Sequence, residues 1–188
     1  MSHWFDITRP VRTGMQVYAP EEGYAFEQQK TIGPDSDCNL SRISMGCHCG
    51  THMDAPAHFL EDGATIETID PELLTGPARV ATVTDEAALP NLTGVKRLIL
   101  RMRTPGLSIA QCEALAASEV RLLGVDLLSI CTGAATAPGH RIVLGAGIWI
   151  IETLDLTGVP DGDCELVCLP LKLEGREAAP ARALVRPL

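Results

Sequence analysis

The sequence predicts a mixed α/β domain whose sheet is rolled towards a barrel and which has few helices. Short strand-like runs recur along the whole chain, whereas only two or three segments have helical signals. The composition indicates an aliphatic core with many turns, because 46% of the residues are hydrophobic, only 4% are aromatic, and the chain contains 17 Gly and 13 Pro. With 188 residues, we expect a single domain over residues 1–188 that can bury a sizeable core.

Strands are expected where apolar residues alternate with polar ones, or run together, between Gly and Pro residues. The strongest example is the run 147–154, which contains Ile148, Trp149, Ile150 and Ile151. The polar stretch 21–30 has no clear assignment. In chain order, we expect strands at residues 4–8, 39–45, 78–83, 95–102, 122–128, 147–154, 165–173 and 182–187.

Helical signals are fewer and local. Residues 70–76 read as a one-turn helix, with an aspartate cap, a proline at the first position and a terminating glycine. A capping box at residues 108–111 opens a helix that runs to about Ser118. Residues 132–138 are small and loop-like, and a helical turn is expected at 140–144.

Potential metal ligands are concentrated between Gly46 and Phe59. Three of the five histidines, His48, His52 and His58, lie in this segment together with Asp54. In an extended chain these four even-numbered residues share one face. A straight strand would hold the first two histidines roughly 13 Å apart, whereas ligands each lie only about 2 Å from a shared ion. The chain must therefore fold back at the glycine between them, and we predict a metal-binding loop rather than scattered surface histidines.

Two residues in the second half of the chain could complete such a site. His140 is the only histidine there, and Glu152 follows it inside the apolar run 147–154. A carboxylate buried without a partner is costly. The pattern alone leaves two interpretations open for each residue: a ligand, or a loop histidine and a water-facing carboxylate at a strand end.

The overall composition restricts the class of partner. The formal net charge of -9 argues against nucleic acid and against anionic membranes. No apolar run reaches the roughly 18 residues of a membrane span, and the start lacks the basic and apolar regions of a signal peptide. Seven cysteines are an odd number without framework spacing, which favours reduced thiols and a cytoplasmic location. The expected partner is a small-molecule substrate.

The segment 48–58 reads HCGTHMDAPAH and matches the pattern H-x-G-T-H-x-D-x-P-x-H of the cyclase family of metal-dependent hydrolases. This family includes bacterial kynurenine formamidase (arylformamidase) and isatin hydrolase. Residues 140–152 resemble the second motif block of the family. The resemblance implies a swivelling β/β/α-like, cyclase-family fold and a homodimer or higher homo-oligomer.

The same resemblance implies roles for individual residues. It makes His58 the general acid/base, and it places Tyr18 where kynurenine formamidases tend to carry an aromatic against the substrate ring, although a core or surface aromatic is an equal alternative. The histidine and carboxylate set suits zinc best, with manganese as the alternative. The implied ligands of two divalent ions are His48, His52 and Asp54 for one, and Asp54, His140 and Glu152 for the other, with Asp54 and Glu152 shared.

The expected reaction is hydrolysis of an amide-type C–N bond through a metal-activated water, with an aryl formamide such as N-formylkynurenine as the first candidate. One alternative is hydrolysis of a cyclic amide or lactone at the same site, and one from another class is a non-catalytic metal-binding domain. The sequence departs from kynurenine formamidases at residues 126–130, where their Thr and a following acid are missing, and at 103–108, which are short. Specificity for an aryl formamide is therefore open.

Overall fold

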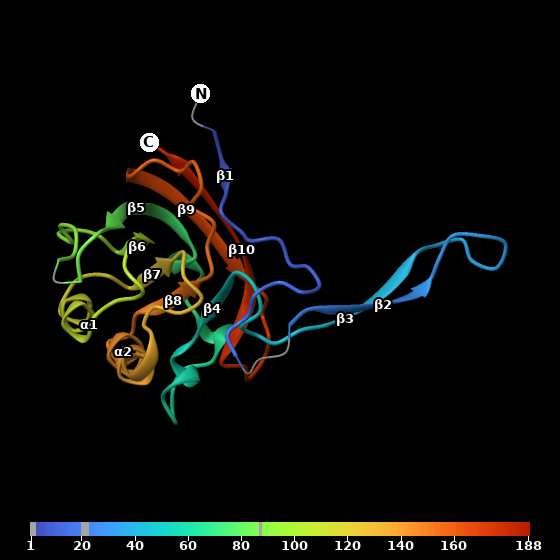
Figure 1. Cartoon of the computed structure of the whole chain (residues 1–188), viewed down its shortest axis with the longest axis horizontal. Helices are drawn as coiled ribbons and strands as arrows, with labels where there is room; N and C mark the ends of the chain where they lie inside the picture. The colour runs from blue at the N-terminus through green and yellow to red at the C-terminus, as the bar shows by residue number, and fades with distance from the viewer. Residues whose placement is uncertain (1–2, 20–22, 87) are drawn as a thin grey trace.

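The computed structural model describes residues 3–19, 23–86 and 88–188. Its main sheet has eight strands in the order β1-β10-β4-β8-β7-β6-β5-β9, and a further pairing of β10 with β9 closes all of them except β1 into a barrel (Figure 1). The expected sheet rolled towards a barrel is confirmed. The strands of this sheet are β1 (Phe5–Asp6), β4 (His52–Asp54), β5 (Thr75–Val83), β6 (Arg97–Met102), β7 (Leu122–Val125), β8 (Trp149–Glu152), β9 (Gly162–Pro170) and β10 (Ala178–Pro187).

The strands β5, β6, β7 and β8 are parallel neighbours, and two helices lie against this part of the sheet. Helix α1 (Ile109–Ala116) connects β6 to β7, and helix α2 (Thr136–Gly145) connects β7 to β8 (Figure 1). Parallel strands need such crossover connections. The predicted capping box is confirmed, because the Ser108 hydroxyl accepts from the Gln111 N–H and the Gln111 side chain accepts from the Ser108 N–H.

Along the strands, successive side chains pack alternately into two different apolar cores. Met53 and Ile151 belong to a cluster with members from strands all around the ring, which places them inside the barrel. Ile150 belongs to a second cluster that includes Leu115 of α1 and Val143 of α2. Side chains that alternate with Met53 and Ile151 therefore point out of the barrel, towards the face that the helices cover.

Two of the helical expectations need correction. Residues 70–76 do contain a single turn, a 3-10 helix over Pro71–Leu73 whose Asp70 cap accepts from the Glu72 N–H, but Gly76 lies inside β5 instead of ending the turn. The prediction of a loop at 132–138 was wrong, because Gly133–Ala135 forms a 3-10 turn and α2 already begins at Thr136. Pro138 is tolerated in the first turn of α2, where the N–H groups have no partner within the helix.

A two-stranded antiparallel arm extends away from the barrel (Figure 1). It consists of β2 (Ala25–Lys30) and β3 (Leu40–Ser44), and every residue of both strands is exposed. Strand β3 was expected from the alternation of residues 39–45, whereas β2 lies in the stretch that had no assignment, of which residues 21 and 22 fall outside the described residues. In the described part of the chain, no helix has the length and apolar character needed to cross a membrane.

Candidate metal centre

The pairing of β4 with β8 brings the two predicted motif segments together. His52 lies directly opposite Glu152 in the antiparallel register. Because His52, Asp54 and Glu152 alternate with the barrel residues Met53 and Ile151, their side chains share the face outside the barrel. The His52 Nε2 atom lies 3.3 Å from Asp54 Oδ1 and 3.6 Å from Glu152 Oε2. The strand register thus joins residues that are far apart in the sequence.

Helix α2 adds His140 to this group. The His140 Nε2 atom lies 3.2 Å from Glu152 Oε1 and 4.0 Å from Asp54 Oδ2. Its Nδ1 atom lies 2.7 Å from the Thr136 carbonyl oxygen, one helical turn earlier. An Nδ1–H that donates to this oxygen leaves the Nε2 lone pair directed at the two carboxylates. His140 is therefore a buried helix residue that faces the centre, and the interpretation as a loop histidine was wrong.

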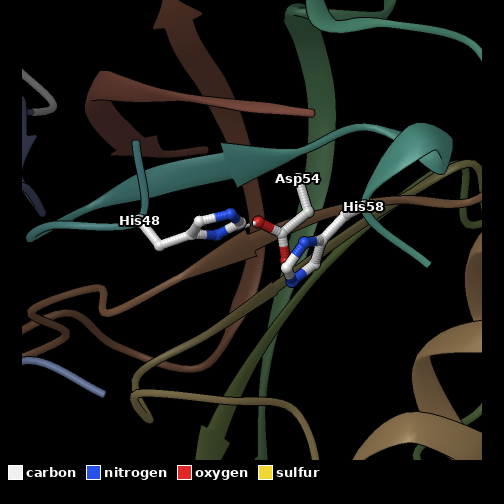
Figure 2. Close-up of side chains that lie close together, drawn as sticks. All are labelled: His48, Asp54 and His58. Atoms are coloured by element: carbon white, nitrogen blue, oxygen red, sulfur yellow. Dashed lines mark ion pairs between the residues drawn. The ribbon is translucent and has the colours of Figure 1, made fainter. Parts of the chain in front are cut away.

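The loop before β4 and the turn after it supply the remaining two histidines. Gly50 has a φ of 73°, so the chain folds back where the sequence predicted. His48 Nδ1 lies 2.9 Å from Asp54 Oδ1. His58 is the last residue of a 3-10 turn, Pro56–His58, and the centroid of its ring lies 4.1 Å from that of His48. Figure 2 shows His48 and His58 approaching the Asp54 carboxylate.

The polar atoms at the centre fit a bound cation. His52 Nε2 and both carboxylate oxygens of Asp54 are buried without a hydrogen bond of good geometry, although His48 Nδ1 is close to one of these oxygens. Buried polar atoms left without partners are unfavourable. Imidazole nitrogens and carboxylate oxygens are also the donors that zinc and similar divalent ions take in proteins. The residues present therefore fit a divalent metal ion.

Two groups of possible ligand atoms meet at Asp54. Within each group, the ligand atoms lie within 4.8 Å of one another. Both groups differ from the sets implied by the family resemblance, because His58 takes the place expected for His52 in the first group and His52 takes the place expected for His140 in the second. Among the described residues, the groups are His48, Asp54 and His58, and His52, Asp54 and Glu152.

Charge pairing controls protonation at the centre. Burial disfavours the charged form of His52, but the neighbouring carboxylates of Asp54 and Glu152 together outweigh burial and hold the pKa of His52 well above its ordinary value. Burial also opposes ionisation of Asp54, yet the charge of His52 and the closeness of His48 hold the pKa of Asp54 well below its usual range. His58 behaves differently, because burial outweighs the nearby carboxylates and lowers its pKa. A neutral imidazole at His58 can accept a proton near neutral pH.

A cavity of about 190 Å³ opens onto the centre. Its lining also includes Tyr18, Phe59 and Leu128, which add apolar surface to the polar groups of the centre. Tyr18, expected as a substrate contact, lines this cavity and is 43% exposed. Phe59 was missed by the sequence analysis, although it directly follows the motif. Its ring stacks on that of His140 at 4.5 Å and meets the edge of the His58 ring at 4.4 Å.

Comparison with known proteins finds full-length similarity. The kynurenine formamidase of Bacillus cytotoxicus is 32% identical over 206 residues, which cover 100% of this chain and 99% of that protein. The solved structure named "predicted metal-dependent hydrolase from Bacillus stearothermophilus" is 31% identical, with a TM-score of 0.84 and 100% of both chains covered. Isatin hydrolase A from Labrenzia aggregata shares the fold, with 19% identity, a TM-score of 0.83, and coverage of 99% of this chain and 94% of the other.

The barrel and the site on its outer face together define a metal-dependent hydrolase. A family model described as "Putative cyclase" matches residues 5–99. The chain belongs to this Cyclase family.

Proposed function

We propose that this hydrolase cleaves an amide-type C–N bond and that its substrate is an aryl formamide such as N-formylkynurenine. The observation that supports the proposal most directly is the meeting of three histidines and two carboxylates beside a neutral His58 at one end of a partly aromatic cavity. The similarity to kynurenine formamidases over the whole chain points to the same substrate class.

In this proposal, His48, His52, Asp54, His140 and Glu152 hold the metal. A bound divalent ion supplies Lewis acidity, which polarises a carbonyl and lowers the pKa of water from about 15.7 towards 7. The chain's own contribution to proton transfer comes from His58. Its ring nitrogen takes a proton from the attacking water and passes it to the nitrogen that leaves when the C–N bond breaks.

The apolar residues that line the cavity suit the ring of an aryl substrate. Tyr18 and Phe59 present aromatic surface, and Leu128 adds aliphatic surface beside Ser129. Leu128 and Ser129 belong to the segment 126–130 that departs from kynurenine formamidases. This departure weakens the argument for an aryl formamide and keeps a second candidate, hydrolysis of a cyclic amide or lactone, because the altered segment lines the cavity next to Glu152.

A substrate panel separates the two candidates. The metal-loaded protein should hydrolyse N-formylkynurenine faster than isatin or a simple lactone, as measured by initial rates at matched concentrations. Activity on the cyclic compounds alone would reject the formamidase proposal and support the second candidate.

Substitutions at His58 and Asp54 test the assigned roles. His58→Ala should retain most of its metal and lose about 10²- to 10⁴-fold in kcat, which is the range for a general acid/base. Asp54→Ala should lose both metal and turnover, because its carboxylate belongs to both ligand groups. His3→Ala, which changes the histidine outside the site, is the matched control. An unchanged rate in His58→Ala would contradict the mechanism.

The number and identity of the ions form a further part of the proposal. We expect two zinc ions per chain, because the donors are imidazole and carboxylate groups and Asp54 can serve two sites. Elemental analysis of the purified protein checks this. One ion per chain, or manganese in place of zinc, would correct the number or the metal without changing the assigned ligands.

We also propose that residues 1–188 act as one cytoplasmic domain that assembles as a homodimer or a larger homo-oligomer. The exposed β2–β3 arm supports assembly, because an isolated two-stranded hairpin is at best marginally stable in water. Phe26 and Ile43 pair across the arm and are 57% and 58% exposed. Packing of the arm against a second copy of the chain would cover these side chains.

A further inference from the structure

Each of the three histidines proposed as ligands, His48, His52 and His140, has one ring nitrogen that faces Asp54 and one, the outer nitrogen, that faces away. His52 Nδ1 lies 2.8 Å from the Gly50 carbonyl oxygen, which leaves its Nε2 facing the carboxylates. His140 has the same arrangement with the carbonyl oxygen of Thr136. In both cases a backbone oxygen fixes which nitrogen carries the proton and which faces inward.

His48 has the opposite orientation. Its Nδ1 faces inward, 2.9 Å from Asp54 Oδ1, and its outer atom is Nε2. That outer atom meets a carboxylate instead of a backbone oxygen, because Glu177 Oε1 lies 3.6 Å away. Glu177 is therefore a charged neighbour of the outer nitrogen of His48, where His52 and His140 have neutral backbone oxygens.

The backbone of Glu177 is held next to the ligand strand. Its carbonyl oxygen accepts a hydrogen bond of 2.8 Å from the Ala55 N–H, and the next residue, Ala178, pairs with Asp54 in the β10–β4 register. The Glu177 side chain is 40% exposed, whereas the side chain of His48 is only 11% exposed. The carboxylate can therefore be altered without opening a hole in a packed core.

We propose that Glu177 is a positioning residue for the metal centre, which keeps the proton of His48 on Nε2 and turns Nδ1 inward. A carboxylate at the outer nitrogen of a ligand histidine fixes its tautomer and its ring orientation and makes the inner nitrogen a stronger donor. This inference rests on the role proposed above for His48 as a metal ligand. Neither motif segment contains Glu177.

Cobalt binding tests the proposal independently of turnover. Metal-free protein is titrated with Co²⁺ in competition with a chelator, and the visible spectrum of the bound ion is recorded. Glu177→Ala should weaken cobalt affinity by about 10- to 100-fold, as loss of such outer partners does, and should change the spectrum. Glu177→Gln should have a smaller effect, because it keeps a polar oxygen beside the outer nitrogen and removes only the charge. Glu174→Gln, an exposed glutamate in the same connection, is the matched control and should bind like the wild type.

Three results would overturn the proposal. The first is wild-type affinity and spectrum in Glu177→Ala, and the second is an equal loss in Glu174→Gln. The third is the loss of a whole equivalent of cobalt in Glu177→Ala, which would make Glu177 a ligand. Thermal unfolding of the metal-free variants should match the wild type and so excludes misfolding as the cause. A wild type that binds cobalt but hydrolyses none of the panel would contradict the proposed function while leaving the Glu177 result valid.

Discussion

Asp161 is a surface carboxylate that links two strands of the barrel. Its Oδ2 atom accepts a hydrogen bond of 2.8 Å from the Thr82 N–H on β5, and its Oδ1 atom pairs with Arg101 on β6. Arg101 in turn donates to the carbonyl oxygens of Leu156 and Val159. One carboxylate thus helps to fix the loop after β8 against the edge of the parallel sheet.

The stability that Asp161 contributes should depend on pH. Burial is the largest single influence and raises its pKa, but the hydrogen bonds from Thr82 and Arg101 and the charge of Arg101 together outweigh burial, so its pKa in the folded protein lies below the ordinary 3.8. A lowered pKa in the folded state means that the contribution is complete above about pH 4 and is lost as the pH falls through the folded pKa. Asp161→Asn should therefore reduce the free energy of unfolding by about 1 kcal/mol at neutral pH. The difference should shrink towards about pH 3.

Urea unfolding of both proteins across this pH range measures the effect. Asp35→Asn, at an exposed position in the arm, serves as the control. If the loss of unfolding free energy in Asp161→Asn stays constant down to pH 3, Asp161 stabilises the protein through packing and neutral hydrogen bonds and not through its charge.

At the scale of single residues, local spacing was the informative signal. His48, His52, Asp54 and His58 could be found because they lie close together in the chain and share one parity. Glu177 carries no such signal, since its proximity to His48 arises only when β10 pairs with β4.

Gly63 controls the turn that carries His58. A Cβ atom at this position would lie 2.4 Å from the Ala57 nitrogen and 2.4 Å from the Pro56 carbonyl carbon. These are backbone atoms of the 3-10 turn, so the turn itself would have to move. The turn also depends on a hydrogen bond of 3.0 Å from the Ala57 N–H to the Ala64 carbonyl oxygen.

We expect Gly63→Ala to destabilise the protein by about 1–3 kcal/mol, which is the range for overpacking, and to reduce turnover by displacing His58. Gly145→Ala is the matched control, because a Cβ atom in that place in α2 meets nothing within 4 Å. The control should be neutral or stabilising by about 0.4–1 kcal/mol. Urea unfolding and initial rates measure both variants, and equal stabilities would contradict the steric explanation.

Among the elements, those with strong local signals were predicted best. The capping box of α1 and the apolar run of β8 have such signals. The early start of α2 was missed because Thr136, Pro138 and Gly139 have weak helical preference, and packing beside β8 decides their conformation. Strand β2 was missed because its polar sequence does not alternate clearly, and its pairing with β3 defines it.

For the whole molecule, the arm makes assembly testable. The double variant Phe26→Ser with Ile43→Ser should reduce the molar mass in solution towards that of one chain, because it removes the apolar side chains proposed to contact a second copy. Glu27→Ser with Arg42→Ser, the neighbouring pair on the arm, is the control and should keep the wild-type mass. Size-exclusion chromatography with light scattering measures the mass. A monomeric wild type, or an unchanged mass in the apolar double variant, would reject the arm as the contact.

The barrel topology itself was only partly accessible from the sequence. Many strands and few helices indicated a rolled mixed sheet, but local patterns contain no information about which strands are neighbours. Strand β10 shows the difficulty, because it lies between β4 and β9 and pairs with both.

That placement of β10 has a consequence for how the protein is made. During synthesis, β4 emerges from the ribosome long before β10, the strand that flanks it on the side away from β8. Until the later strand arrives, this edge of β4 lacks a partner, and pairing with β8 alone holds the three-residue strand in place. Binding of the metal ion should therefore follow translation of nearly the whole chain. A messenger RNA truncated before the β10 codons should yield a protein that does not retain the metal ion.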